Sequence, residues 1–285
     1  MDFDQAIKRL IDTALQEDLG ASGDITTLAL LNESTVISGK LILREKGVLA
    51  GLPYLEYLFK KIDPKITVEL RVDEGSYQTA GTVLAKITGP ARAIIAGERT
   101  ALNFLQHASG VATIYAQYVR KVRGLKCEIL DTRKTLPGLR ALEQYAIRVG
   151  GGVNHRLGLN HRFLIKRNHL AFFAMESSRP IQDAVKRVRA YLPEIPVEVE
   201  VGDFEQLKEA LLTDCESLML YNMSQEEISR ALKMIRKTNK KAYFEGRSSV
   251  TLETIRMFAE TGIDGIATSA SYFAKPTDIR LRIMI

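Results

Sequence analysis

Basic side chains gather in one stretch of the sequence, residues 131–169. The stretch holds eight Lys and Arg residues and two acidic residues, so its formal charge is +6, which equals the net charge of the whole chain. Three of the four histidines also lie in it. Such focused positive charge predicts a site for a small, highly anionic molecule. A nucleic-acid groove would show a longer basic stripe with interleaved aromatic residues, and we therefore expect no nucleic-acid partner.

Four basic residues of this stretch, Arg133, Lys134, Arg156 and Lys166, are the main candidates for binding such a molecule. They stay protonated at neutral pH, so they suit the binding of carboxylates and phosphates and not general-base catalysis. Arginine gives a planar fork for a carboxylate, and lysine gives a point charge for a phosphate. A lone basic residue is most often a solvated surface residue, whereas several at neighbouring strand ends favour a binding site.

Other polar residues nearby have two interpretations each. Glu198 and Glu200 alternate with valines in VEVEV, so both side chains point to the same side of a strand. A carboxylate inside a barrel is costly unless paired, and Lys166 is the expected partner; the other role is to bind ribose hydroxyls, or Mg²⁺ through water. His155 is either a structural histidine or a donor to a ligand carboxylate. Glycines 150–152 form either a structural loop or a close backbone approach to a ligand.

The first part of the chain has the pattern of a mixed α+β domain. In the turn-rich segment EDLGASGDITT, Asp24 is placed to bond local backbone amides. Helical spacing of apolar residues and strand alternation punctuated by Gly and Asp predict the remaining elements. In chain order these are a helix over 4–16, antiparallel strands within 36–50, a helix over 53–60, strands within 66–88 and a helix over 91–108.

After Gly110 short apolar runs alternate with helical patterns. Repeating βα units predict a parallel sheet, and a dinucleotide-binding fold is not favoured because no GxGxxG motif follows the first run. Polar residues fall at the carboxyl ends of the runs, where an α/β barrel builds its active site. Six strands are fewer than the usual eight, so we expect an incomplete barrel. The predicted strands are 127–130, 162–166, 197–201, 217–221, 242–246 and 265–269, and the predicted helices are 111–123, 138–149, 180–191, 203–213, 225–238 and 251–261.

The composition is that of an ordinary globular protein. Hydrophobic residues make up 46% and charged residues 26% of 285 residues, enough for a substantial core. The sequence has no run of eighteen apolar residues, and MDFDQAIKRL lacks the apolar core of a signal peptide. We therefore expect no membrane partner and a cytoplasmic location.

Several long segments resemble one known family. As they stand here they are EDLGASGDITT, GERTALNFLQHASGVAT, LDTRKTLPGLRALEQYAIRVGGGVNHRLGL, LIKRNH, VEVEV and YNMS. With these segments the chain resembles the quinolinate phosphoribosyltransferases, also called carboxylating nicotinate-nucleotide pyrophosphorylases. The resemblance implies an N-terminal α+β open-faced sandwich domain followed by an incomplete, TIM-like α/β barrel. We expect the first domain over 1–108, the barrel over 109–270, and a segment 271–285 that returns to the first domain.

The resemblance also implies an activity and a set of site residues. Such enzymes transfer phosphoribose from 5-phosphoribosyl-1-pyrophosphate to quinolinate, and decarboxylation then gives nicotinate mononucleotide for NAD biosynthesis. The expected cofactor is Mg²⁺, which the substrate pyrophosphate carries. No direct protein ligand is expected, and Glu200 is the candidate to contact the ion through water. The expected assembly is a homodimer or higher homo-oligomer with a shared active site. By motif, the catalytic residues are Lys134, Lys166 and Glu200, and the substrate-binding residues are Arg99 (reaching the partner's site), Arg133, His155, Arg156, Lys166, Tyr221, Arg247, Ser248 and Ser269.

The departures from the family pattern fall in the phosphoribosyl half of the site. Tyr221 stands where the family has Asp in L-D-N, and Arg167 replaces the Asp of K-D-N-H. The two phosphate turns read Glu245-Gly246-Arg247-Ser248-Ser249 and Thr268-Ser269-Ala270-Ser271. Both lack glycines that would let backbone amides approach a phosphate closely.

These departures predict a quinolinate phosphoribosyltransferase with weakened transfer activity and an intact acid pocket. Two alternatives stay open. The C-terminal TSASYFAKPTDIRL resembles ModD-type paralogues encoded beside molybdate transporters, which points to another anionic acceptor. The other alternative is an anion-binding protein that has lost catalysis.

Overall fold

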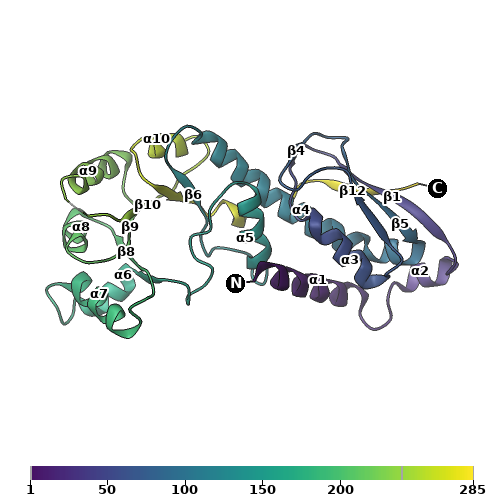
Figure 1. Ribbon diagram of the computed structural model, residues 1–285, viewed down its shortest axis with the longest axis horizontal. Helices are drawn as coiled ribbons and strands as arrows, with labels where there is room; N and C mark the ends of the chain where they lie inside the picture. Colours follow the sequence, from purple (N-terminus) through teal and green to yellow (C-terminus); the bar gives the residue numbers. More distant parts are fainter. Residues whose placement is uncertain (1, 239, 285) are drawn as a thin grey trace. The chain divides into compact units, whose positions relative to one another are not determined.

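The computed structural model describes residues 2–238 and 240–284, and the chain divides into two compact units (Figure 1). The first unit contains Met1–Ala116, Lys134–Gly151 and Ala270–Ile285. The second contains Gln117–Arg133 and Gly152–Ser269. The chain therefore leaves the first unit and returns to it twice.

The first unit is built on a four-stranded antiparallel sheet in the order β12-β1-β5-β3. Alternate residues of β1, Gly39, Leu41 and Leu43, are buried, as strand periodicity requires for a sheet with one covered face. The predicted helices and strands of this part are confirmed, except for the end of the predicted helix 91–108. The elements are α1 (Phe3–Leu19), α2 (Ile25–Leu30), β1 (Val36–Leu43), β2 (Gly47–Val48), η1 (Leu52–Tyr54), α3 (Leu55–Ile62), β3 (Thr67–Leu70), β4 (Tyr77–Gln78), β5 (Val83–Pro90), α4 (Ala91–Lys121), α5 (Arg140–Val149), η2 (Ala270–Phe273) and β12 (Ile279–Met284).

Local signals explain where two of the helices begin. Asp2 is the N-cap of α1 and accepts a hydrogen bond from the backbone N–H of Gln5 at 3.2 Å. Asp24 accepts from the backbone N–H of Thr27 at 3.0 Å, so the predicted bond to a local amide is confirmed. That bond caps the short helix α2, where the sequence had predicted only a turn.

Helix α4 differs from the prediction of two helices, 91–108 and 111–123, because it runs unbroken from Ala91 to Lys121. Gly110 in its middle was the reason for the predicted break. The glycine is needed for packing, because a Cβ at this position would lie 2.2 Å from the carbonyl oxygen of Lys275. The segment that leads into β12 thus lies against the helix at a point where only glycine fits.

The second unit is a six-stranded parallel sheet in the order β6-β11-β10-β9-β8-β7, with helices outside it (Figure 1). The edge strands are β6 and β7, so the barrel is incomplete, as predicted. Helix α6, directly after β7, was not predicted. The elements are β6 (Glu128–Leu130), β7 (Phe163–Ile165), α6 (Arg167–Phe173), α7 (Pro180–Tyr191), β8 (Val197–Val201), α8 (Phe204–Leu211), β9 (Ser217–Tyr221), α9 (Gln225–Ile235), β10 (Tyr243–Arg247), α10 (Ile255–Ala259) and β11 (Gly265–Ala267).

Within the described residues, every helix is too short or too polar to cross a membrane.

Candidate active site

The carboxyl ends of the parallel strands lie at one edge of the second unit, called here the mouth. Arg133 follows β6, and Lys166 follows β7. Tyr221 and Arg247 are the last residues of β9 and β10. Because all six strands run in the same direction, their carboxyl ends lie at the same edge. These four predicted site residues therefore lie at the mouth.

Four cations lie near one another at the mouth: Arg133, Arg156, Lys166 and Arg247. Arg156 is 7% exposed, and burial lowers its pKa, followed by repulsion from Arg133 and Arg247. The pKa of Lys166 is likewise lowered by burial and then by Arg247, whereas Glu200 acts in the opposite direction. Cations that repel each other in a partly desolvated place are a ready site for an anion with several negative charges.

Glu200 and Tyr221 stand on neighbouring strands at the mouth. Glu200 is 6% exposed, and its carboxylate accepts a hydrogen bond from the backbone N–H of Arg167 at 3.4 Å. The guanidinium of Arg167 lies 5.6 Å from the centre of the Tyr221 ring. Asn222, the next residue, has φ 55°, and its N–H donates to the carbonyl of Arg247 at 2.8 Å. This left-handed turn, which Asn tolerates, ties the ends of β9 and β10 together.

The segment that carries His155 and Arg156 is fixed by Asp131. One carboxylate oxygen of Asp131 accepts from the backbone N–H of His155 at 2.7 Å, and the other accepts from the Asn154 side chain at 2.8 Å. Val153 forms an isolated parallel bridge with Leu130, so the segment extends the edge of β6. Asp131, itself 1% exposed, therefore holds His155 and Arg156 in place.

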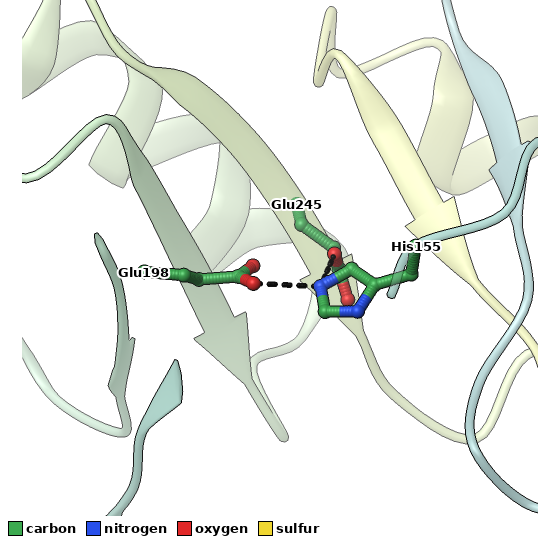
Figure 2. Close-up of side chains that lie close together, drawn as sticks. All are labelled: His155, Glu198 and Glu245. Atoms are coloured by element: carbon green, nitrogen blue, oxygen red, sulfur yellow. Dashed lines mark hydrogen bonds and ion pairs between the residues drawn. The ribbon is translucent and has the colours of Figure 1, made fainter. Parts of the chain in front are cut away.

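Beneath the mouth, His155 meets two buried carboxylates (Figure 2). Its Nε2 lies 2.6 Å from Glu198 and 3.1 Å from Glu245, which come from β8 and β10. Both carboxylates are 1% exposed. Arg162 lies 3.6 Å from the same oxygen of Glu198. Burial opposes a charged imidazole, but the contacts with Glu198 and Glu245 prevail and raise the pKa of His155 to about 9.

The same three side chains are the only group of this kind with metal-ligand spacing among residues 2–238 and 240–284. Their distances fit a shared proton better than an ion. Ligand atoms at ~2.0–2.1 Å from one metal lie about 2.9 Å or more apart. The separation of 2.6 Å between His155 and Glu198 is shorter than that and has the length of a charge-assisted hydrogen bond.

The structure changes one expectation about pairing. Glu198 pairs with His155 and Arg162 instead of with Lys166. The reason is that Glu198 lies two residues before Glu200 on the same face of β8, and is therefore further from the mouth. Lys166 is instead influenced by Glu200. Glu245 and Arg162 were not singled out for this cluster. Glu245 interrupts the apolar pattern of its strand, and that polar residue was the signal available in the sequence.

Of the remaining predicted site residues, two lie at the mouth and two lie in the first unit. Ser248 and Ser269, both half-buried, follow β10 and β11 in the second unit. Arg99 is exposed on α4 and Lys134 is exposed before α5, both in the first unit. Gly150 has a packing reason, since a Cβ there would lie 2.4 Å from the carbonyl oxygen of Ala112 in the same unit. That favours the structural interpretation of this glycine.

Both parts of the chain match models of one family. Residues 24–109 match the N-terminal domain, and residues 111–282 the C-terminal domain, of quinolinate phosphoribosyl transferase. The chain is 41% identical over 273 residues to the carboxylating nicotinate-nucleotide pyrophosphorylase of Mycobacterium leprae, covering 94% of this chain and 93% of that protein. It is 32% identical over 281 residues to a probable enzyme of the same name from Bacillus subtilis, covering 98% and 94%.

Solved structures agree with these matches. The nicotinate-nucleotide pyrophosphorylase of Ehrlichia chaffeensis has a TM-score of 0.89 at 34% identity and covers 97% of this chain and 98% of its own. That of Francisella tularensis has a TM-score of 0.90 at 32% identity and covers 100% and 98%. The sandwich and the incomplete barrel thus define a class of two-domain transferases. The chain belongs to the quinolinate phosphoribosyl transferase family.

The mutual repulsion at the mouth can be tested through Lys166. Replacing Arg247 by Ser removes a neighbouring cation, so the pKa of Lys166 should rise and its neutral amine fraction should fall by about threefold or more. Labelling with a limiting acylating reagent at fixed pH, followed by peptide mass spectrometry, measures that fraction. Arg230→Ser is the control, because Arg230 stacks on Phe204. Equal labelling of Lys166 in both variants would show that Arg247 does not face it.

Proposed function

We propose that this chain transfers the phosphoribosyl group of 5-phosphoribosyl-1-pyrophosphate to quinolinate, with decarboxylation to nicotinate mononucleotide. The observation that carries the proposal is the set of four cations at the mouth of a barrel that belongs to this family. Both proposed substrates are small and multiply charged anions. The names of the relatives from Mycobacterium leprae and Bacillus subtilis support the same reaction.

The acid pocket consists of Arg133, His155, Arg156 and Lys166 in this proposal. Arg156 is largely buried, so an anion that reaches it exchanges water for a charge-assisted hydrogen bond in a place of low dielectric. Arg133 is half-buried after β6, and its charge adds to the repulsion that an anion at this place would relieve. Two arginine forks suit a dicarboxylate such as quinolinate.

Catalysis in this arrangement rests on orientation and charge. The pyridine nitrogen attacks the anomeric carbon, the bond to pyrophosphate breaks, and the electron pair leaves with the pyrophosphate. No side chain has to act as a nucleophile. Lys166 and Arg247 supply positive charge for the leaving group, and Arg133 and Arg156 fix the acceptor.

Mg²⁺ fits this site as a companion of the substrate. The ion prefers oxygen ligands and usually takes one or two carboxylates together with substrate phosphates. Glu200 brings a carboxylate to the mouth, whereas both oxygens of Asp131 hold the segment of His155. Glu200 would therefore contact the ion through water, and when bound the ion would neutralise charge on pyrophosphate.

The phosphoribosyl half of the site departs from the family pattern, and these departures favour a weak enzyme. Tyr221 brings no negative charge at the position where the family has Asp, and its ring is held by Arg167. Arg247 and Ser248 replace residues of a glycine turn, so phosphate would be bound by a side chain and not by close backbone amides. Ser269 makes the same change in the last turn.

The activity test is the formation of nicotinate mononucleotide, followed by mass spectrometry, with quinolinate, phosphoribosyl pyrophosphate and Mg²⁺. We expect turnover below about 1 per second, the lower end of the ordinary range. Tyr221→Asp should raise the rate only in part, because the altered turns remain. Wild-type turnover above that value would mean that Tyr221 and Arg247 are an equivalent solution. Quinolinate binding without any product would favour the anion-binding alternative.

Quinolinate binding itself depends on Arg156. Arg156→Ala removes a buried positive donor, and such a loss costs about 2–5 kcal/mol, so binding should weaken by at least tens-fold. Isothermal titration calorimetry measures the effect, and Arg187→Ala, at a residue that stacks on Phe173 of α6, is the matched control. Unaltered affinity in Arg156→Ala would remove this residue from the acid pocket.

The proposal includes a homodimer whose active sites are shared. Arg99, exposed on the first unit, would complete the site of a second copy. Arg99→Ala and Lys166→Ala should each be inactive alone, whereas a mixture should regain up to about a quarter of the wild-type activity after subunits exchange, because a quarter of random sites carry neither change. Light scattering gives the oligomeric state. A monomer, or no recovery after exchange is demonstrated, would contradict a shared site.

A further inference from the structure

His155 sits where two acidic strands of the barrel converge. Its Nε2 is the one ring atom that both Glu198 and Glu245 approach, at 2.6 and 3.1 Å, and Figure 2 shows the carboxylates meeting it from two different strands. The side chain of His155 is 7% exposed. The segment that carries it is held by Asp131 through the backbone N–H of His155. The ring therefore has little freedom to turn away from the carboxylates.

The number of charges decides the state of the ring. Two buried carboxylates need compensation, since an unpaired buried charge costs several kcal/mol. Arg162, at 3.6 Å from Glu198, supplies one positive charge. Both oxygens of Glu245 and one oxygen of Glu198 are buried without a hydrogen-bond partner among the described residues. A neutral imidazole would leave Glu245 either ionised without compensation or protonated, whereas an imidazolium compensates the pair.

Charged groups of both signs surround the His155 ring. Asp131 at the end of β6 and the two glutamates favour a charged ring, whereas Arg162, Arg156 and, near Glu245, Arg247 disfavour it. Below the ring, at the amino ends of the strands, lies a cavity of about 380 Å³ whose lining includes His155, Arg162, Glu216, and the pair formed by Glu128 and Tyr243. The cavity offers solvent a route to the cluster for proton exchange.

We propose that Glu198 and Glu245 are positioning residues that hold His155 as a cation at the floor of the acid pocket, so that it serves the acceptor as a charged donor throughout the neutral pH range. Only the use of the cation, which is to bind the acceptor, rests on the proposed function. The charge itself is a property of the free protein. The two parts can therefore fail separately.

The raised pKa of His155, about 9, agrees with this geometry. The sign follows from the shift. A histidine whose pKa is higher in the folded protein stabilises the fold fully below its ordinary pKa near 6.5, and this contribution is lost as pH rises towards 9. Within the cluster, the His155 and Arg162 contacts lower the pKa of Glu198 despite burial, and His155 likewise opposes the effect of burial on Glu245. The pKa of Glu245 is raised, mainly by burial.

Histidine-selective NMR tests the charge directly. The chain has four histidines, so their ring signals are few, and His155→Gln identifies the one in question. We expect the His155 signal of the metal-free wild-type protein to titrate above pH 8. Glu198→Gln should move this midpoint down by at least about one unit, because one charged hydrogen bond is replaced by a neutral one. Glu205→Gln, at an acid that is 83% exposed on α8, is the control and should leave it unchanged.

Two results would overturn the proposal: a wild-type midpoint at or below pH 8, or a stoichiometric metal ion found in the purified protein by elemental analysis. Glu245→Gln provides a second variant if Glu198→Gln does not fold by circular dichroism. Its midpoint should fall in the same direction.

Calorimetry with quinolinate tests what the cation is for. Wild-type affinity should change by about twofold or less between pH 6 and 9, whereas Glu198→Gln, with a midpoint near 8, should lose about tenfold over that interval as its ring loses the proton. A tenfold loss in the wild type would contradict the proposal. Absence of quinolinate binding in both proteins would reject the proposed acceptor, and the NMR titration would still decide the charge of His155.

Discussion

Two carboxylates buried in one sheet impose the constraint on which the barrel unit depends. Glu198 and Glu245 are both 1% exposed, and neither can remain ionised there without cations. The cations come from the irregular segment between α5 and β7, where His155 and Arg162 reach the two carboxylates. Compensating these charges therefore draws that segment into the barrel. Arg156, the residue after His155, is brought to the mouth as a consequence.

The alternation of β-strands then separates the barrel interior into two levels of charge. Along β8, Glu198 lies below and Glu200 above, and along β10, Glu245 lies below and Arg247 above. In the lower level the acids face His155 and Arg162. The upper level has an excess of cations, and burial with mutual repulsion lowers the pKa of Arg156 and Lys166. An anionic ligand at the mouth relieves that repulsion.

Much of this arrangement could be predicted from sequence because it depends on local periodicity. The βα alternation predicted the parallel sheet. The location of the mouth was predicted from polar residues at strand ends, namely Asp131, Lys166, Glu200 and Tyr221. The side-chain partners could not be predicted, because they depend on the tilt of strands and on loops. Glu198 was expected to face Lys166 and instead pairs with His155 and Arg162. The unbroken helix α4 was not predicted for a similar reason. Gly110 is needed because the backbone at Lys275, far away in the sequence, packs against it.

The position of β12 has a consequence for how the chain folds. This strand is the last element of the structure, and it pairs with β1 along a register from Ser38↔Met284 to Leu43↔Ile279. The β1 edge of the first sheet therefore stays unpaired during synthesis until the chain has been made as far as β12. Pairing residues so far apart in sequence is slow, because the entropy of closing the long loop is lost before the contact forms. The barrel unit can fold before the first unit is complete. During that interval, chaperones or other nascent chains can bind to the unpaired edge of the sheet.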